Sequence, residues 1–147
     1  MNQHVALITG GAKGIGRGIA LDLASRQWKI AVCYRTSDAE AKTTAQEIMQ
    51  RGGQALVIRC DVSDPVAAKN MVTQVEKEWG RIDVLINGAG PYHRINLLDE
   101  TIDGWNDMFD GNLHPIFYLA QAVAPGMKAR KAGRIISFSM ANADQME

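Results

Sequence analysis

The segment Thr9-Gly10-Gly11-Ala12-Lys13-Gly14-Ile15-Gly16 decides how this chain folds. A short apolar run at residues 5–8 precedes it, and apolar residues recur at helical spacing after it, at Ile15, Ile19 and Leu23. The pattern predicts a β-strand, a glycine-rich turn and an α-helix. Such a turn points free N–H groups of the helix start beyond the strand end, where the helix dipole favours a phosphate. Glycines let the backbone turn sharply and let a pyrophosphate approach closely.

The spacing of the glycines indicates which phosphate ligand the turn fits. A nucleoside-triphosphate loop would end in Gly-Lys-Ser/Thr, whereas Lys13 precedes Gly14 here and no Ser or Thr follows. The common dinucleotide fingerprint GxGxxG also fails, because Ile19 stands where its third glycine belongs. The pattern present is TGxxxGxG, made by Thr9, Gly10, Gly14 and Gly16. Taken alone, it is also compatible with an ordinary tight strand-to-helix turn.

Composition excludes several function classes. The 147 residues, 46% of them hydrophobic, suit one globular domain over residues 1–147. Lys plus Arg equals Asp plus Glu at 16 each, so no nucleic-acid partner is expected. No apolar run approaches the about 20 residues of a membrane span, so no membrane partner is expected and the location should be cytoplasmic. Cys33 and Cys60 lie in apolar runs and should be buried, reduced thiols without a metal.

Strand and helix patterns alternate along the chain. Apolar runs predict further strands at residues 29–34, 55–60, 82–86 and 134–138. A capping box of Ser37 and Glu40 predicts the start of one helix, and Asp64 with Pro65 predicts the start of the next, which Gly80 ends. Helices are also expected at 101–110 and 113–130. The residues expected on the apolar face of the longer helix are Ile116, Phe117, Ala120, Val123 and Met127.

This alternation predicts an α/β fold, a Rossmann-like doubly wound parallel sheet with helices on both faces. Ligands of such sheets bind beyond the carboxyl ends of the strands. Polar residues and glycines follow the predicted strand ends at residues 10–16, Arg35, Asp61, residues 87–90 and Ser139. These positions therefore form the expected binding edge.

Several motifs together resemble the short-chain dehydrogenase/reductase family, in particular its 3-oxoacyl-carrier-protein reductase group. Besides TGxxxGxG, Asp61-Val62 is similar to the family's Asp-Val after the third strand, and residues 87–90 are similar to its NNAG motif with Gly88 as a departure. Asn112-Leu113 matches the Asn-Leu that opens its long helix. The resemblance spans the whole chain and implies these cofactor-binding residues: Thr9, Gly10, Gly11, Lys13, Gly14, Ile15, Gly16, Arg35, Asp61, Val62, Asn87, Ala89 and Gly90. The alternatives remain a helix-proximal cap for Asp61, a turn former for Asn87 and a helix breaker for Asn112.

The resemblance also implies hydride transfer between nicotinamide and a small carbonyl or alcohol substrate, carried out by an Asn-Ser-Tyr-Lys set. Asn112 and Ser139 are the expected catalytic members, although Met140 occupies the usual place of the serine. No Tyr-x-x-x-Lys stands in the sequence. The expected strand order is 3-2-1-4-5, without the last two strands of the family. We therefore expect a cofactor-binding part that is inactive alone, from an enzyme that forms homo-oligomers.

Charge at the end of the second predicted strand bears on the cofactor. An NAD site places an acidic residue there for the ribose hydroxyl, whereas an NADP site places a cation for the 2′-phosphate. Tyr34 stands at the position where an NAD site has its acidic residue, and Arg35 follows it. Lys13 adds a second cation in the glycine turn. The sequence thus predicts NADP(H) as the preferred cofactor, with NAD(H) left open and a solvated Arg35 as the alternative. Two other hypotheses remain: a non-catalytic NADP-binding module, and an interaction subunit that completes its sheet with another chain.

Overall fold

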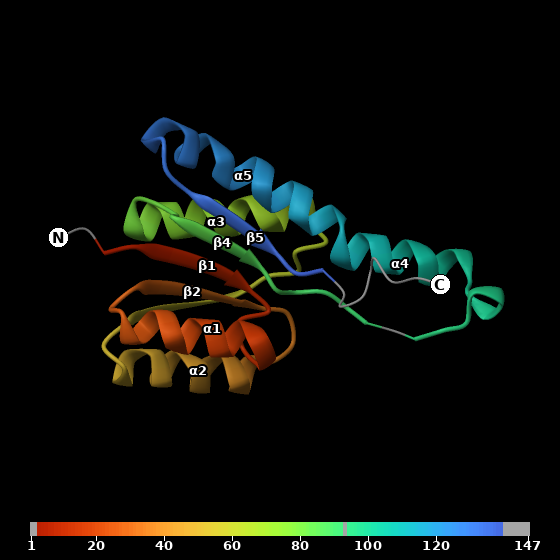
Figure 1. The fold of residues 1–147 in the computed structure, drawn as a ribbon, viewed down its shortest axis with the longest axis horizontal. Coiled ribbons are helices and arrows are strands. Elements are labelled where there is room, and N and C mark those ends of the chain that lie inside the picture. The colour runs from red at the N-terminus through yellow and green to blue at the C-terminus, as the bar shows by residue number, and fades with distance from the viewer. Residues whose placement is uncertain (1–2, 93, 140–147) are drawn as a thin grey trace.

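The computed structural model describes residues 3–92 and 94–139. Five strands form one parallel sheet in the order β3-β2-β1-β4-β5, which confirms the predicted fold class and strand order (Figure 1). The strands are β1 (Val5–Thr9), β2 (Lys29–Tyr34), β3 (Gln54–Arg59), β4 (Val84–Asn87) and β5 (Arg134–Ser137). The helices are α1 (Gly14–Ser25), α2 (Asp38–Gln50), α3 (Pro65–Trp79), the short 3₁₀ helix η1 (Leu97–Asp99), α4 (Ile102–Asn112) and α5 (His114–Arg130).

Helices cover both faces of the sheet. Figure 1 shows α1 and α2 on one side, and α3 and α5 on the other. Successive residues of β1 alternate between the two cores, because side chains along a strand point to opposite faces. Val5 and Leu7 join the core under α3 and α5, and Ala6 and Ile8 join the core under α1 and α2. Burial on both faces explains why β1 is apolar without interruption until Thr9.

The ends of α3 form as the sequence predicts, whereas the capping box of α2 does not. Asp64 Oδ1 accepts the N–H groups of Val66 at 2.8 Å and Ala67 at 3.2 Å, and Gly80 ends α3 with φ of 78°. Ser37 precedes α2, but its side chain makes no capping hydrogen bond. Its backbone, with ψ of 61°, lacks the extended conformation that points an N-cap hydroxyl at the helix start.

The predicted apolar face of the longest helix is partly wrong. Residues spaced by four along α5 are buried, and these are Pro115, Leu119, Val123 and Met127. Phe117 lies off this stripe and is 62% exposed. The sequence pattern was ambiguous because α5 carries apolar residues on most of its surface, so only the contact with the sheet fixes which stripe is inward.

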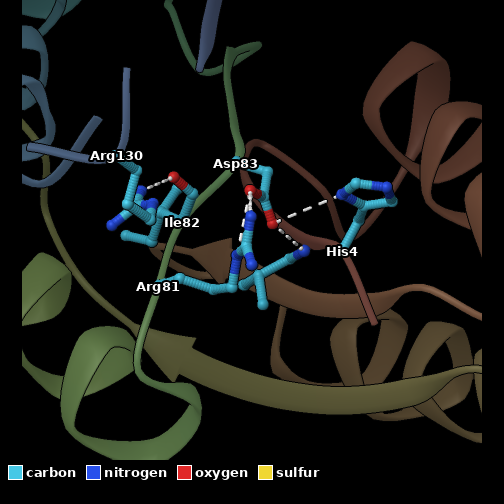
Figure 2. Close-up of polar contacts among 6 residues, drawn as sticks. His4, Arg81, Ile82, Asp83 and Arg130 are labelled. Carbon is cyan, nitrogen blue, oxygen red and sulfur yellow. Dashed lines mark hydrogen bonds and ion pairs between the residues drawn. The ribbon is translucent and has the colours of Figure 1, made fainter. Parts of the chain in front are cut away.

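A polar cluster closes the opposite edge of the sheet, where the strands begin (Figure 2). Asp83 accepts the Val5 N–H at 2.9 Å and the Arg81 Nε–H at 3.0 Å, and His4 Nδ1 lies 3.7 Å from it. Arg130 of α5 donates to the Ile82 carbonyl at 2.6 Å. β4 begins at Val84 rather than at the predicted residue 82, although the Asp83 backbone already bonds to Val5 at 2.8 Å and to Arg134 at 2.9 Å. Burial alone would raise the pKa of Asp83, but the hydrogen bonds and the neighbouring positive charges outweigh it and hold that pKa below its usual range.

We expect Asp83→Asn to lower the free energy of unfolding at neutral pH by about 1–3 kcal/mol, because Arg81 loses a charged, nearly buried partner. The folded-state pKa is the lower one, so this stabilisation is present above the unfolded pKa of about 3.9 and is lost as the pH falls through the folded pKa. Urea unfolding should show a difference between the two proteins that closes in acid. Asp22→Asn, which breaks an exposed pair with Arg26, is the control and should cost below about 0.5 kcal/mol. Equal stability of Asp83→Asn and the parent at neutral pH would contradict the expectation.

Candidate functional site

A cavity of about 890 Å³ opens at the carboxyl ends of the strands. Its walls come from the turn after β1, the ends of β2 and β3, the segment after β4, and α4. The lining includes most of the predicted cofactor residues: Gly10, Lys13, Gly14, Ile15, Gly16, Arg35, Asp61, Val62, Ala89 and Gly90. The structure therefore brings together segments as far apart in sequence as Gly10 and Phe138, at the edge where doubly wound sheets bind ligands.

The glycine turn presents backbone rather than side chains to this cavity. Gly10 and Gly14 have φ of 65° and 56°, which other residues rarely adopt. A Cβ on Gly14 would meet nothing within 4 Å, so the space beside it is open. Lys13 precedes α1, and its side chain makes no capping hydrogen bond. The first N–H groups of α1 therefore stand at the cavity without a side-chain cap, in an arrangement suited to a phosphate.

Two side chains of opposite charge stand at the ends of β2 and β3. Arg35 Nη1 lies 3.6 Å from Asp61 Oδ2, and both side chains are largely exposed. Asp61 also accepts from the Ser63 hydroxyl at 2.7 Å and from the Ser63 N–H at 3.0 Å. The Ser63 hydroxyl bond contributes most to keeping the pKa of Asp61 below its ordinary value, and Arg35 adds to it. Asp61 is thus an ionised acceptor beside a cation that faces open solvent.

Tyr34 occupies the position at which an NAD site has an acidic residue. Its hydroxyl donates to Asp38 Oδ1 at 2.6 Å, at the start of α2. The pKa of Tyr34 is raised, chiefly by this hydrogen bond, and the pKa of Asp38 is lowered by its bonds with Lys42 and Tyr34. Asp38 is therefore already engaged with Lys42 at 2.7 Å and with Tyr34. Arg35 and Lys13 remain as the cations of this end of the cavity.

Three predicted cofactor residues do not line the cavity and instead hold its backbone in place. The Thr9 hydroxyl is buried and accepts the N–H groups of Gly88 and Ala89, both at 3.1 Å, which ties the segment after β4 to β1. The Gly11 N–H donates to the Cys33 carbonyl at 3.2 Å. Asn87 Nδ2 donates to the Ser137 hydroxyl at 3.1 Å and so links β4 to β5.

The two predicted catalytic residues also lie outside the cavity lining. Asn112 ends α4, and its side-chain amide donates to Met108 O at 2.9 Å and to Pro91 O at 3.1 Å. It therefore fastens the segment after β4 to α4. Ser139 is exposed beyond β5, whereas its neighbour Phe138 lines the cavity. Met140, the other residue considered for the serine position, lies outside the described residues.

Sequence reasoning missed several lining residues. The hydroxyl groups of Thr36, Ser37 and Ser63 follow the ends of β2 and β3, and their position after a strand was a usable signal. Asp107, Met108, Asp110 and Gly111 of α4 also line the cavity. No local pattern marks them, because only the path of the chain between β4 and α4 brings them to the site.

The described residues contain no group of three or more His, Cys, Asp or Glu side chains that could hold a metal ion. His114 Nδ1 lies 2.8 Å from Asp110, one helical turn away, and His93 lies outside the described residues. Across the described part of the chain, none of the helices has the length and apolar character needed to span a bilayer.

Comparison with known proteins identifies the family. A family model described as short chain dehydrogenase matches residues 4–146. The chain belongs to the short chain dehydrogenase family. It is similar to the 3-oxoacyl-(acyl-carrier-protein) reductase FabG of Staphylococcus aureus, with 36% identity over 134 residues, 91% of this chain and 54% of that protein. A 3-oxoacyl-(acyl-carrier-protein) reductase of Synechocystis is 33% identical over 95% of this chain and 56% of its own length.

Solved structures of short chain dehydrogenases have the same fold. A mutant short-chain dehydrogenase/reductase of Serratia marcescens superposes with a TM-score of 0.91 at 31% identity, over 99% of this chain and 59% of that one. A metagenomic short-chain oxidoreductase in complex with NADP superposes with a TM-score of 0.88 at 33% identity, over 95% of this chain and 64% of that one. The chain thus spans a little more than half the length of these relatives.

Proposed function

We propose that this chain is the cofactor-binding part of an NADP(H)-dependent oxidoreductase that transfers hydride between nicotinamide and a small carbonyl or alcohol substrate. The observation that supports this most is the cavity itself. Its glycine turn offers uncapped N–H groups for a pyrophosphate, and Asp61 offers an ionised acceptor for the adenine amine. The cavity is large enough for a ligand of drug size or above. Family membership and similarity to a short-chain oxidoreductase crystallised in complex with NADP support the same cofactor class.

The preference for NADP(H) over NAD(H) follows from the charges at the end of β2. Tyr34 offers no carboxylate for a ribose 2′-hydroxyl, and its own hydroxyl is bonded to Asp38. Arg35 and Lys13 both line the cavity. A guanidinium can bind a phosphate through two parallel hydrogen bonds. Binding of NADPH and NADH, measured by calorimetry, tests this directly. NADH binding as tightly as NADPH would contradict the preference.

We expect Arg35→Gln to weaken NADP⁺ binding by about 10- to 100-fold, because one charged hydrogen-bonding partner of the 2′-phosphate is lost. NAD⁺ lacks that phosphate, so its affinity should change less than about threefold by the same argument. Arg51→Gln is a matched control, since Arg51 caps the far end of α2 and does not line the cavity. If Arg35→Gln weakened the binding of NADP⁺ and NAD⁺ equally, Arg35 would not contact the 2′-phosphate.

A second candidate function, an interaction subunit that completes its sheet with another chain, is favoured by the edge strand β5. Ile135 and Ile136 are 42% and 45% exposed although they point to opposite faces of the sheet, and Phe138 beside them is exposed as well. Exposed apolar edge strands pair readily with other chains. Light scattering after size exclusion distinguishes a monomer from the homo-oligomer that we predict. The cytoplasmic location likewise stays a prediction.

A further inference from the structure

One hydroxyl group on α2 bonds outside its own helix, to the glycine turn. The Thr44 hydroxyl donates to the Ala12 carbonyl oxygen at 2.9 Å, although 32 residues separate the two in sequence. A helical threonine often bonds the carbonyl one turn back in its own helix, and the neighbouring Thr43 does so, since its hydroxyl donates to Ala39 O at 3.0 Å. The bond of Thr44 instead joins two elements that the sequence keeps apart.

The Ala12 carbonyl depends on this hydroxyl for its hydrogen bond. Thr44 is 0% exposed and Ala12 is 3% exposed, so water has little access to this contact. Among the described residues, no other donor reaches Ala12 O. A buried carbonyl without a donor is costly, so the hydroxyl fixes the direction in which this carbonyl points.

The same peptide group carries the Lys13 N–H. This peptide bond is trans, so its N–H points opposite to its carbonyl, which is away from α2. Lys13 is exposed and extended, with φ of −152°, and both Ala12 and Lys13 line the cavity. Within residues 3–92 and 94–139, no acceptor bonds the Lys13 N–H. The peptide group therefore has an engaged, buried carbonyl and an N–H that is left for a ligand.

Further contacts hold the turn and α2 in a fixed relation. Arg17 Nη2 of α1 donates to both carboxylate oxygens of Glu47 at 2.7 Å, one helical turn beyond Thr44 on α2. On the other side, the Gly11 N–H donates to the Cys33 carbonyl of β2 at 3.2 Å. Because these contacts do not involve the Thr44 hydroxyl, its removal should act on the peptide group rather than on the placement of the helix.

We propose that Thr44 is a positioning residue, whose hydroxyl orients the peptide between Ala12 and Lys13 so that the Lys13 N–H donates to a phosphate oxygen of the cofactor. The inference rests on the proposed function. Thr44 acts only through this peptide and does not touch the ligand. Without the hydroxyl, the Ala12 carbonyl must take its hydrogen bond from water in the cavity. The peptide then rotates, which turns the N–H away from the phosphate and a carbonyl dipole toward it.

The first test compares NADP⁺ affinities by calorimetry. Thr44→Val removes the hydroxyl at nearly constant shape and should weaken binding about tenfold or more, the usual effect of losing a hydrogen bond to a charged group. Thr44→Ser keeps a donor and should bind within about threefold of the parent by the same argument. Thr43→Val is the matched control, since its hydroxyl bonds only within α2, and it should leave the affinity unchanged. Equal affinity of Thr44→Val and the parent would overturn the inference, as would a loss that Thr44→Ser does not restore.

Partial ligands separate the orientation of a phosphate donor from general damage to the cavity. Adenosine carries no phosphate, 2′-AMP carries only the 2′-phosphate, and ADP carries only the pyrophosphate. Titrations followed by amide NMR signals measure such weak binding. Thr44→Val should weaken ADP or 2′-AMP, according to which phosphate the Lys13 N–H contacts, and should leave adenosine unchanged. Equal weakening of all three ligands would indicate general damage and would overturn the inference.

The Lys13 amide supplies a readout in the unaltered chain, so the test does not depend on a variant that folds. Its proton signal should move downfield when NADP⁺ binds, and it should move less in Thr44→Val. If NADP⁺ shifts the amides of Gly14 and Ile15 but not that of Lys13, the inference is overturned and the proposed function stands. If the parent shows no NADP⁺ binding, the proposed function fails, and inorganic pyrophosphate then decides the inference. A Lys13 shift with pyrophosphate that Thr44→Val removes supports it, and no shift overturns it.

Discussion

Gly16→Ala is expected to lower the free energy of unfolding by about 3 kcal/mol, at the upper end of the usual range for overpacking. A Cβ on Gly16 would overlap the Gly10 carbonyl oxygen and would also press on the Gly11 Cα at 3.0 Å. All of these neighbours are backbone atoms of the turn, so no side chain can move aside. The turn must shift instead, and the cavity wall shifts with it. NADP⁺ affinity should therefore fall together with stability.

Gly18→Ala is the matched control in the same helix. A Cβ on Gly18 would meet nothing within 4 Å, and alanine favours the helix by about 1 kcal/mol over glycine, so this variant should be slightly stabilised. Thermal melting separates the two, since 1 kcal/mol corresponds to roughly 2–4 °C for a domain of this size. A Gly16→Ala chain as stable as Gly18→Ala would show that α1 can move away from β1 without cost.

The sequence predicted well those features that depend on short-range chemistry. The glycine turn, the Asp64 cap and the Gly80 helix end are decided within a few residues, where backbone conformation and local hydrogen bonds control the outcome. The parallel direction of the strands followed from their near-continuous apolar character and the alternation with helices, and their order followed from the family resemblance. Of the thirteen cofactor residues that the family resemblance implied, ten line the cavity.

What the sequence did not predict depends on contacts between distant segments. The inward stripe of α5 is decided by the strands beneath it, so Phe117 was assigned to the wrong side. Thr9 matches a binding motif, yet its hydroxyl is used to tie Gly88 and Ala89 to β1, a pairing across nearly 80 residues that no local pattern encodes. Asn112 similarly fastens Pro91 to α4. A motif thus located the site but did not separate residues that contact a ligand from residues that support the wall.

The 147-residue chain is expected to bind NADP(H) without reducing carbonyl substrates at a meaningful rate. The family resemblance implies a proton donor in a Tyr-x-x-x-Lys motif, and none of Tyr34, Tyr92 and Tyr118 is followed by lysine at that spacing. Loss of a positioned general acid typically costs about 10²- to 10⁴-fold. Without the lysine contact, nicotinamide and substrate should also be displaced from their reactive positions, which lowers the rate by a further factor on the order of 10². NADP⁺ should still raise the melting temperature, because the turn, Arg35 and Asp61 are in place.

The measurement is loss of NADPH absorbance with 3-oxoacyl esters, diketones and aldehydes, carried out on the same sample whose melting temperature NADP⁺ raises. That pairing separates a folded, binding chain without a proton donor from a chain that has simply unfolded. Turnover within the common enzyme range of about 1–10³ per second would contradict the expectation. It would require a proton donor outside the family motif, and Tyr92 is the first to test, because it is exposed next to Pro91 of the cavity wall. Tyr92→Phe would then abolish the rate if Tyr92 is the donor, and an unchanged rate would assign the proton to another group.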